Sequence, residues 1–259
     1  MTSTTKNKIL ISGTSTGLGK YLSERLEADD YNRTTESAPQ TEYETIIHCA
    51  TAPNPRDNTL AESHFHQSQF ELCDNLVNIP HKLFILISCT DIYPQSDSGL
   101  TEETVIDVGA IETVIGQSKW QCETLVTGRA KNHLILRCSS LLGIDMRLNN
   151  AIRVLADKID EIKVTANSSY NFITHEMVGD FIDISFSKQL TGIYNLAAIG
   201  TIRLEQIAIA ARRHVEFGDD HYRSPLVNNT KAANYLPSLK QTSTEVLKNF
   251  WHMNRHFFV

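Results

Sequence analysis

Residues 12–19 read Ser-Gly-Thr-Ser-Thr-Gly-Leu-Gly, and this stretch decides the fold. The apolar run Lys8–Ser12 predicts a buried strand before it, and Gly17–Ala28 carries apolar residues at helical spacing after it. Glycines in such a unit allow a tight turn, a close approach of the backbone to a pyrophosphate, and close packing of helix on strand. The helix N-terminus adds free N–H groups and a favourable dipole. These features predict a dinucleotide-phosphate site, whose residues are Gly13, Thr16, Gly17, Leu18 and Gly19.

The rest of the chain alternates between short apolar runs and amphipathic segments. Further strands are predicted at Thr45–Cys49, Leu83–Ser88, His133–Arg137 and Gly192–Leu196. Further helices are predicted at Leu60–Val77, Ala110–Thr127, Arg203–His214 and Ser243–Trp251. Unalternating apolar strands separated by helices indicate an α/β protein with a doubly wound parallel sheet. We expect residues 1–142 to form the dinucleotide-binding part, and residues 143–259 to add the last strands and a small substrate lobe within one compact domain.

Composition narrows the classes of protein to which the chain can belong. Of its 259 residues, 41% are hydrophobic and 21% are charged, which is enough apolar material for a core. The net charge of −6 gives no general attraction to nucleic acid or to an anionic membrane. No apolar run reaches the roughly 20 residues that a membrane-spanning helix needs. With a polar N-terminus as well, we expect a cytoplasmic protein that binds neither nucleic acid nor membrane.

The cysteines and histidines give no metal signature. There are five cysteines, none in C-x-x-C spacing, and the ten histidines are scattered along the chain. Three of the cysteines lie in or beside predicted buried strands, which is typical of reduced core thiols. We therefore expect no metal site.

A group that meets the adenosine ribose is expected near the end of the second strand, about 20 residues after the glycines. The candidate strand is Tyr31–Thr34, and Asp29 and Asp30 come slightly before it. If Asn32 and Arg33 occupy the ribose position, no carboxylate repels a 2′-phosphate and an arginine can bind one. This favours NADP over NAD, although Arg33 as a solvated loop residue explains the sequence equally well.

Several ordered segments resemble the extended short-chain dehydrogenase/reductase superfamily, in its epimerase/dehydratase branch that acts on nucleotide sugars. The similar segments are Gly13–Gly19, Ile46–Thr51, Leu86–Tyr93, Gly116–Glu123, Leu136–Gly143, Tyr170–Val178, Gly192–Leu196 and Asn229–Pro237. The resemblance covers nearly the whole chain and implies an NAD(P)-binding Rossmann fold with a lobe for a small-molecule substrate, often a nucleotide sugar. It also implies that Cys49, Ala50, Thr51 and Lys119 lie at the cofactor, and that a homodimer forms through the helix at 110–127.

The chain departs from this family at its catalytic Tyr-x-x-x-Lys motif. Lys119 stands at the lysine position, but Ile115 stands where the tyrosine is expected. In the family the tyrosine exchanges a proton with the substrate, and because a free tyrosine has a pKa near 10, the lysine is needed to lower it. Isoleucine has no proton to exchange.

The other catalytic candidates follow the strand at 83–88. The family's serine or threonine corresponds to Cys89, or to Thr90 if the alignment shifts by one residue. A thiol would hold a substrate oxygen poorly, because it is a weak hydrogen-bond donor. Asp91 is a candidate acid, or else a turn residue. Two other tyrosines, Tyr93 and Tyr170, are candidate replacements for the missing one, or else packing residues.

Three hypotheses follow. The first is an NAD(P)-dependent oxidoreductase or epimerase with a rearranged proton donor. The second is a catalytically degenerate dinucleotide-binding sensor or regulatory subunit. In the third, the fold persists but binds no dinucleotide. The short interval between Arg33 and Ile46, which lacks the strand–helix unit of a complete family member, indicates a trimmed adenine side.

Overall fold

The computed structural model describes residues 8–31, 42–50, 59–96, 98–158 and 162–258, with the side chains of 59–65 excepted. Its centre is a six-stranded sheet in the order β2-β1-β3-β4-β5-β9, in which every neighbouring pair is parallel. The strands are β1 (Ile9–Ser12), β2 (Asp29–Tyr31), β3 (Tyr43–His48), β4 (His81–Cys89), β5 (His133–Cys138) and β9 (Gly192–Leu196). The predicted doubly wound parallel sheet is therefore confirmed.

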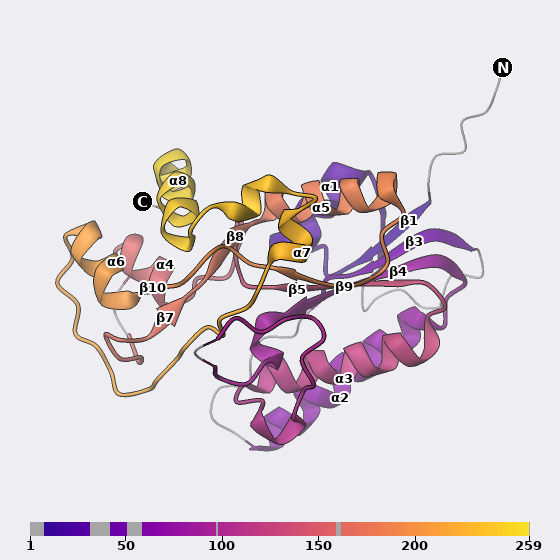
Figure 1. Ribbon diagram of the computed structural model, residues 1–259, viewed down its shortest axis with the longest axis horizontal. Helices are drawn as coiled ribbons and strands as arrows, with labels where there is room; N and C mark the ends of the chain where they lie inside the picture. Colours follow the sequence, from indigo (N-terminus) through magenta and orange to yellow (C-terminus); the bar gives the residue numbers. More distant parts are fainter. Residues whose placement is uncertain (1–7, 32–41, 51–58, 97, 159–161, 259) are drawn as a thin grey trace.

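Helices cover both faces of this sheet (Figure 1). On one face lie α1 (Gly17–Leu26) and α5 (His175–Lys188), and on the other lie α2 (Thr59–Val77) and α3 (Val114–Arg129). The alternation of side chains along each strand supplies both interfaces. In β1, for example, Ile9 and Ile11 belong to the core under α1 and α5, whereas Leu10 belongs to the core under α2 and α3. This explains why the strand runs are apolar without interruption.

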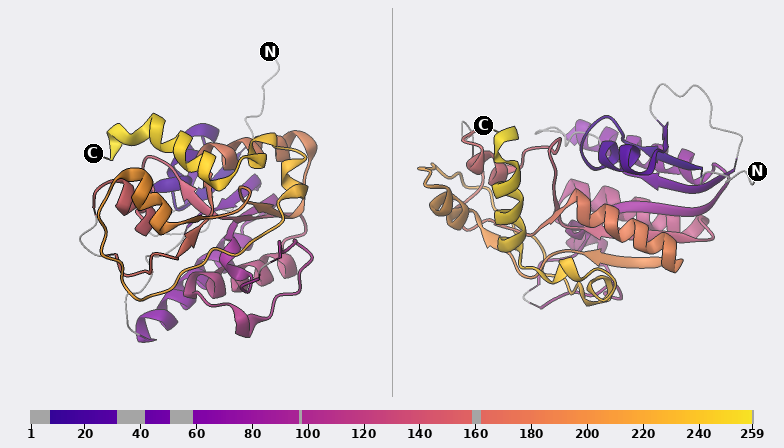
Figure 2. Two further views of the ribbon diagram at one scale, coloured as in Figure 1. Left: turned by 60° about the vertical axis from the view of Figure 1, so that its left-hand side comes forward. Right: turned by 90° about the horizontal axis from the view of Figure 1, so that it is seen from above.

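The second half of the chain also builds a small lobe beyond the carboxyl ends of the strands (Figures 1 and 2). The lobe holds two two-stranded sheets, β10-β7 and β6-β8. Its elements are β6 (Ser140–Leu142), α4 (Asn150–Leu155), β7 (Ser169–Tyr170), β8 (Phe172–Thr174), β10 (Ile202–Arg203), α6 (Leu204–Ala211) and α8 (Ser243–Asn254). A short helix, α7 (Thr230–Ala233), packs near β9. Single 3₁₀ turns occur at Thr90–Ile92, Val108–Ala110, Pro237–Lys240 and Arg255–Phe257.

Several elements differ from the prediction. The second strand, expected at Tyr31–Thr34, is described as β2 at Asp29–Tyr31, so Asp29 and Asp30 lie within it and not before it. The helix expected at Ala110–Thr127 begins only at Val114, because Thr113 caps it by accepting a hydrogen bond from the Gly116 N–H. The helix α5 was not predicted, although its helical start is signalled by Thr174, whose side chain accepts from the Met177 N–H.

The sheet is short on its β2 side. Only residues 32–42 separate β2 from β3, and in the described residues no strand pairs with the outer edge of β2. This short interval agrees with the sequence prediction that the chain lacks a strand–helix unit at this place. None of the helices in the described ranges has the length and apolarity required to cross a membrane.

Candidate functional site

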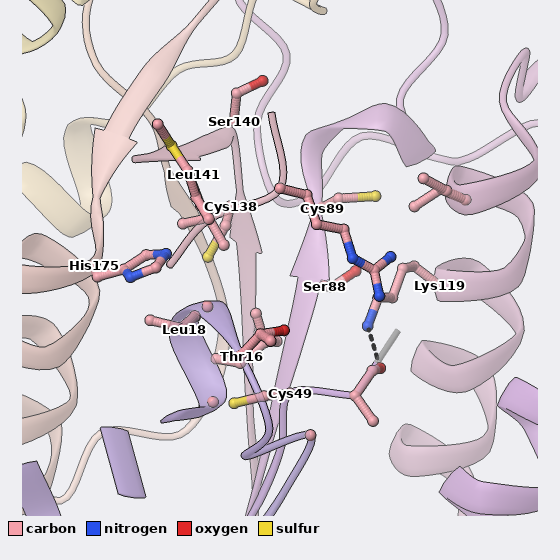
Figure 3. Close-up of a pocket in the computed structure, with 18 of the residues that line it drawn as sticks. Thr16, Leu18, Cys49, Ser88, Cys89, Lys119, Cys138, Ser140, Leu141 and His175 are labelled. Atoms are coloured by element: carbon pink, nitrogen blue, oxygen red, sulfur yellow. Dashed lines mark hydrogen bonds between the residues drawn. The ribbon is translucent and has the colours of Figure 1, made fainter. Parts of the chain in front are cut away.

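A cavity of about 850 Å³ opens at the carboxyl ends of the parallel strands, between the sheet and the small lobe. Parallel α/β sheets place their ligand sites at this edge, at the point where the strand order changes direction. Here that point lies between β1 and β3. Most of the described candidate residues line this one cavity: Gly13, Thr16, Gly17, Leu18, Gly19, Cys49, Ala50, Cys89, Thr90, Asp91, Ile115 and Lys119. Figure 3 shows several of them converging from the ends of β3 and β4 and from α1 and α3.

Close backbone packing requires glycine at two positions of the glycine loop. Gly13 has a φ of +80°, and a Cβ there would lie 2.6 Å from the Cα of Ala50. A Cβ on Gly19 would lie 2.2 Å from the Gly13 carbonyl oxygen. These two glycines let the loop turn tightly and bring α1 against the end of β3.

Gly17 serves a different purpose. Its φ is +63°, but a Cβ there would meet nothing closer than the Asp145 carbonyl oxygen at 3.8 Å, so its backbone faces open space in the cavity. The preceding residue, Thr16, is the N-cap of α1 and makes no side-chain capping bond. The first N–H groups of α1 therefore point toward the cavity without a capping side chain, which is the arrangement that accepts a phosphate. The cradle fits the pyrophosphate of a dinucleotide.

The ribose side of the cavity is only partly described. Asp30, in β2, lines the cavity, and its carboxylate accepts a hydrogen bond of 2.8 Å from the Ser23 hydroxyl. Asn32, Arg33 and Thr51 lie outside the described residues. Asp30 therefore supplies a carboxylate to the cavity at this end of β2.

Lys119 and Ile115 lie one turn apart on α3 and both reach the cavity. The Lys119 side chain is 5% exposed, and its Nζ donates to the Ala50 carbonyl oxygen over 3.4 Å, as the dashed line in Figure 3 marks. The positive charge therefore sits at the ends of β3 and β4, where it also favours ionisation of the neighbouring thiols of Cys49 and Cys89. Ile115 gives this wall an apolar surface.

A phenol from the loop after α6 reaches the same cavity. Tyr222 lines it and donates a hydrogen bond of 3.2 Å to Oδ1 of Asp91. Burial raises the pKa of the Asp91 carboxyl to about 6, and the hydrogen bond from Tyr222 only partly opposes this. Burial and the neighbouring Asp91 charge likewise hold the pKa of Tyr222 well above its usual range. Asp91 is thus poised to gain or lose a proton near neutral pH, with a phenol beside it.

The loop holding Tyr222 is fixed on both sides. Its backbone N–H donates to the Ser168 hydroxyl over 3.1 Å, and its carbonyl accepts from the Ser169 N–H over 2.9 Å. Its ring packs on Tyr170 with 5.0 Å between centroids. Because the sequence of this loop has no periodicity or motif around position 222, nothing in it indicated that Tyr222 would reach the site.

The cysteines of the cavity wall are protonated thiols. Burial raises the pKa of Cys49 to about 12, and it raises that of Cys89 well above the usual range, with help from the Asp91 charge. Neither sulfur is therefore a ready nucleophile. Thr90, which is 2% exposed at the start of the 3₁₀ turn, supplies the hydroxyl at this strand end.

The two tyrosines considered from the sequence have other partners. The Tyr93 hydroxyl donates to Oδ1 of Asn195 over 2.9 Å and accepts from Arg137 over 2.7 Å, inside a buried network. Tyr170 is 3% exposed and stacks on Phe172. Neither of these tyrosines lines the 850 Å³ cavity.

Two further polar residues of the cavity were also not singled out. Ser139 follows β5, and its buried hydroxyl has no hydrogen-bond partner among the described residues. His175 begins α5 and packs so closely on Gly143 that a Cβ there would lie 2.0 Å from its Nδ1. Burial lowers the pKa of His175 to about 4, so its imidazole is neutral. Both residues offer hydrogen bonds to a polar ligand.

Comparison with known proteins gives a match in structure only. No family model matches the sequence, and no curated protein matches it. The solved structure of MoeE5 with UDP-glucuronic acid and NAD superposes with a TM-score of 0.75 at 13% identity, covering 93% of this chain and 99% of that one. A dTDP-4-dehydrorhamnose reductase from Clostridium acetobutylicum superposes with a TM-score of 0.72 at 14% identity, covering 96% and 99%. TunA, an NAD-dependent NDP-hexosamine 5,6-dehydratase, gives 0.72 at 13%, covering 96% and 98%. The chain thus has the fold of these nucleotide-sugar proteins, as the resemblance implied.

Proposed function

We propose that the protein is an NAD(P)-dependent oxidoreductase or epimerase that acts on a nucleotide-sugar-type substrate. The observation that carries this proposal is the single cavity in which the glycine loop, Lys119 and the strand-end residues Thr90 and Asp91 meet. Its volume of about 850 Å³ lies at the upper end of the range for ligand pockets. When bound, the nicotinamide would accept or return a hydride at a sugar carbon.

We infer that Asp91 and Tyr222 carry out the proton transfer that the tyrosine performs in the family this chain resembles. A substrate hydroxyl that is oxidised has to give up its proton to the protein. With a pKa of about 6, Asp91 is mostly a carboxylate at neutral pH and can take that proton directly or through Tyr222. In the second route the phenol oxygen accepts the substrate proton while its own proton moves to Asp91, so Tyr222 is neutral before and after. The reverse reaction uses protonated Asp91 as the acid.

We propose NAD as the natural dinucleotide. The sequence favoured NADP through Arg33, which lies outside the described residues. Asp30, by contrast, is a described carboxylate that lines the cavity at the end of β2, where a 2′-phosphate would be repelled. The solved structures of MoeE5 contain NAD, which agrees with this choice.

A homodimer through α3 remains our prediction for the assembly, and we propose that α2, which packs against α3, takes part in it. Ile111 is buried and Ile115 faces the cavity, so these two residues do not serve an interface. Phe70 on α2 is 39% exposed, and Trp120 on α3 is half-buried. Light scattering on the purified natural protein measures the assembly directly, and a monomer would contradict the prediction.

Titration with NADH and NADPH, followed by nicotinamide fluorescence and calorimetry, tests the proposal first. Micromolar binding is expected, and no binding at millimolar concentration would eliminate both the enzyme and the sensor. The protein with bound NAD is then given UDP-glucose and UDP-glucuronic acid, and the sugar products are followed by NMR.

The alternative function is a catalytically degenerate dinucleotide-binding sensor, which the apolar Ile115 in the cavity wall favours. Ile115→Tyr distinguishes the two. If turnover appears only in this variant, the sensor is supported. If the natural chain converts a nucleotide sugar and Tyr222→Phe or Asp91→Asn lowers kcat by about 10²- to 10⁴-fold with unchanged cofactor binding, the proton route is supported.

A further inference from the structure

Three metal-ligating side chains converge from three elements under the α2–α3 face of the sheet. His48 ends β3, Cys73 lies on α2 and Cys122 lies on α3. One ligand atom of each lies within 4.8 Å of the others. The exposed fractions of the three residues are 0%, 0% and 1%, so the cluster is dry. No sequence motif announces this cluster, because the three positions are far apart along the chain and become neighbours only when α2 and α3 pack on β3.

The imidazole of His48 is oriented as a ligand. Its Nδ1 lies 2.7 Å from the hydroxyl of Ser12 on the neighbouring strand. The tautomer that donates from Nδ1 to this oxygen leaves a lone pair on Nε2. That Nε2 is buried and has no hydrogen-bond partner in the described part of the chain. Histidine ligands of metals usually donate a hydrogen bond from one ring nitrogen, and this bond orients the other nitrogen toward the metal.

A cation lies on the same helix as Cys122. Lys119 lies on α3 one turn before Cys122 and is 5% exposed. Its charge stabilises negative charge on the sulfurs in a region that contains little water.

We propose that His48 Nε2, Cys73 Sγ and Cys122 Sγ bind a single thiophilic cation, either Zn²⁺ or Cu⁺. Both ions prefer thiolate and imidazole ligands. With Zn²⁺, two thiolates balance the charge, and a fourth ligand would come from outside these three side chains. With Cu⁺, three ligands suffice and Lys119 balances the remaining negative charge.

The test uses the reduced full-length protein after removal of metal by a chelator. Co²⁺, as a spectroscopic substitute for Zn²⁺, is expected to give an intense thiolate-to-metal absorption that saturates at one ion per chain. Cu⁺ is titrated separately against a chromogenic chelator, so that the two ions are ranked. Cys122→Ser and Cys73→Ser are expected to lower affinity at least about 100-fold. Cys138→Ser is the matched control, because Cys138 is also buried but lies in β5, outside the cluster.

A second measurement avoids dependence on the folding of variants. In the natural protein, bound Zn²⁺ or Cu⁺ should protect Cys73 and Cys122 from alkylation during partial unfolding, while Cys49 and Cys89 stay reactive, as mass spectrometry would show. Absence of stoichiometric binding of both ions, or equal loss of binding in Cys138→Ser and Cys122→Ser, would overturn the proposal. So would a Cys73–Cys122 disulfide as the state of the isolated protein. Because none of these readouts uses a dinucleotide, they do not depend on the proposed function.

Discussion

Asp91 illustrates how a single residue at this site trades stability for a usable proton. The pKa of its carboxyl is about 6 in the folded protein, compared with an ordinary value near 4. Because the folded value is the higher one, the native state is favoured when Asp91 is protonated and loses stability as pH rises from about 4 to about 6. Above that range the cost stays constant. A group held at such a cost in a cavity is typical of a functional position.

We therefore expect Asp91→Asn to stabilise the protein. The variant removes a poorly hydrated charge but can still accept the hydrogen bond from Tyr222. At pH 8 the free energy of unfolding should rise by about 1–2 kcal/mol, a discounted conversion of the pKa shift. At pH 4 most of the gain should be lost, because Asp91 is then protonated in the folded natural chain and about half protonated in the unfolded chain. Urea denaturation at the two pH values measures this, and a gain of equal size at both would contradict the assigned pKa.

Gly17 and Gly200 permit a matched test of the phosphate cradle. Both have a positive φ, +63° and +69°, and neither has a close neighbour that a Cβ would strike. Alanine at either position should therefore cost a similar amount of stability, about 1 kcal/mol. Only Gly17 lines the cavity, so only Gly17→Ala should weaken NADH binding, by about tenfold or more. Calorimetry of both variants measures the affinities, and equal affinities in the two would show that the loop does not bind the phosphates.

At the scale of elements, a buried ion pair joins α3 to β5. Arg137 and Glu123 are each 2% exposed and lie 2.8 Å apart, and Glu123 also accepts from Ser88 on β4. Glu123→Gln would leave the Arg137 charge poorly compensated and should lower the free energy of unfolding by about 3–5 kcal/mol. Glu44→Gln is the control, since the Glu44–Lys82 pair is 45% and 56% exposed and should be worth less than about 1 kcal/mol. Chemical denaturation compares the two, and similar losses would contradict a structural role for the buried pair.

Most strands of the central sheet and the lobe helices α6 and α8 could be predicted from sequence, whereas the short strands and irregular loops of the lobe could not. Strands β1, β3, β4 and β5 are continuous apolar runs, because both faces of the sheet are covered, and their ends carry the residues that reach the cavity. Tyr222 lies in an irregular loop that donates a hydrogen bond to Ser168 and accepts one from Ser169, and no sequence period reports such a contact. The cluster of His48 with two cysteines depends likewise on how α2 and α3 pack, which is a property of the tertiary structure.

At the scale of the whole molecule, the described sheet extends from β1 through β3, β4 and β5 to β9 on one side, but has only β2 on the other. The described sheet ends at β2, so the adenine half of a dinucleotide would meet fewer elements than the nicotinamide half, which faces the lobe. Discrimination between NAD and NADP then depends on the few groups at the end of β2. Asp30 is the described carboxylate at that place, and its hydrogen bond with Ser23 holds it against α1.

We accordingly expect NADH to stabilise the protein more than NADPH does. At a concentration of 100 times its Kd, a ligand that binds only the folded state adds about 2.7 kcal/mol to the free energy of unfolding. Asp30→Asn should keep the hydrogen bond with Ser23 but remove the charge, and it should shift the ratio of Kd values toward NADPH by about tenfold. Asp29→Asn is the control, because Asp29 is also in β2 but does not line the cavity. Thermal unfolding with each dinucleotide gives the order of stabilisation. A natural chain that binds NADPH more tightly would assign the ribose site to other residues than Asp30, and equal shifts in the two variants would mean that general charge, not contact with the ribose, sets the preference.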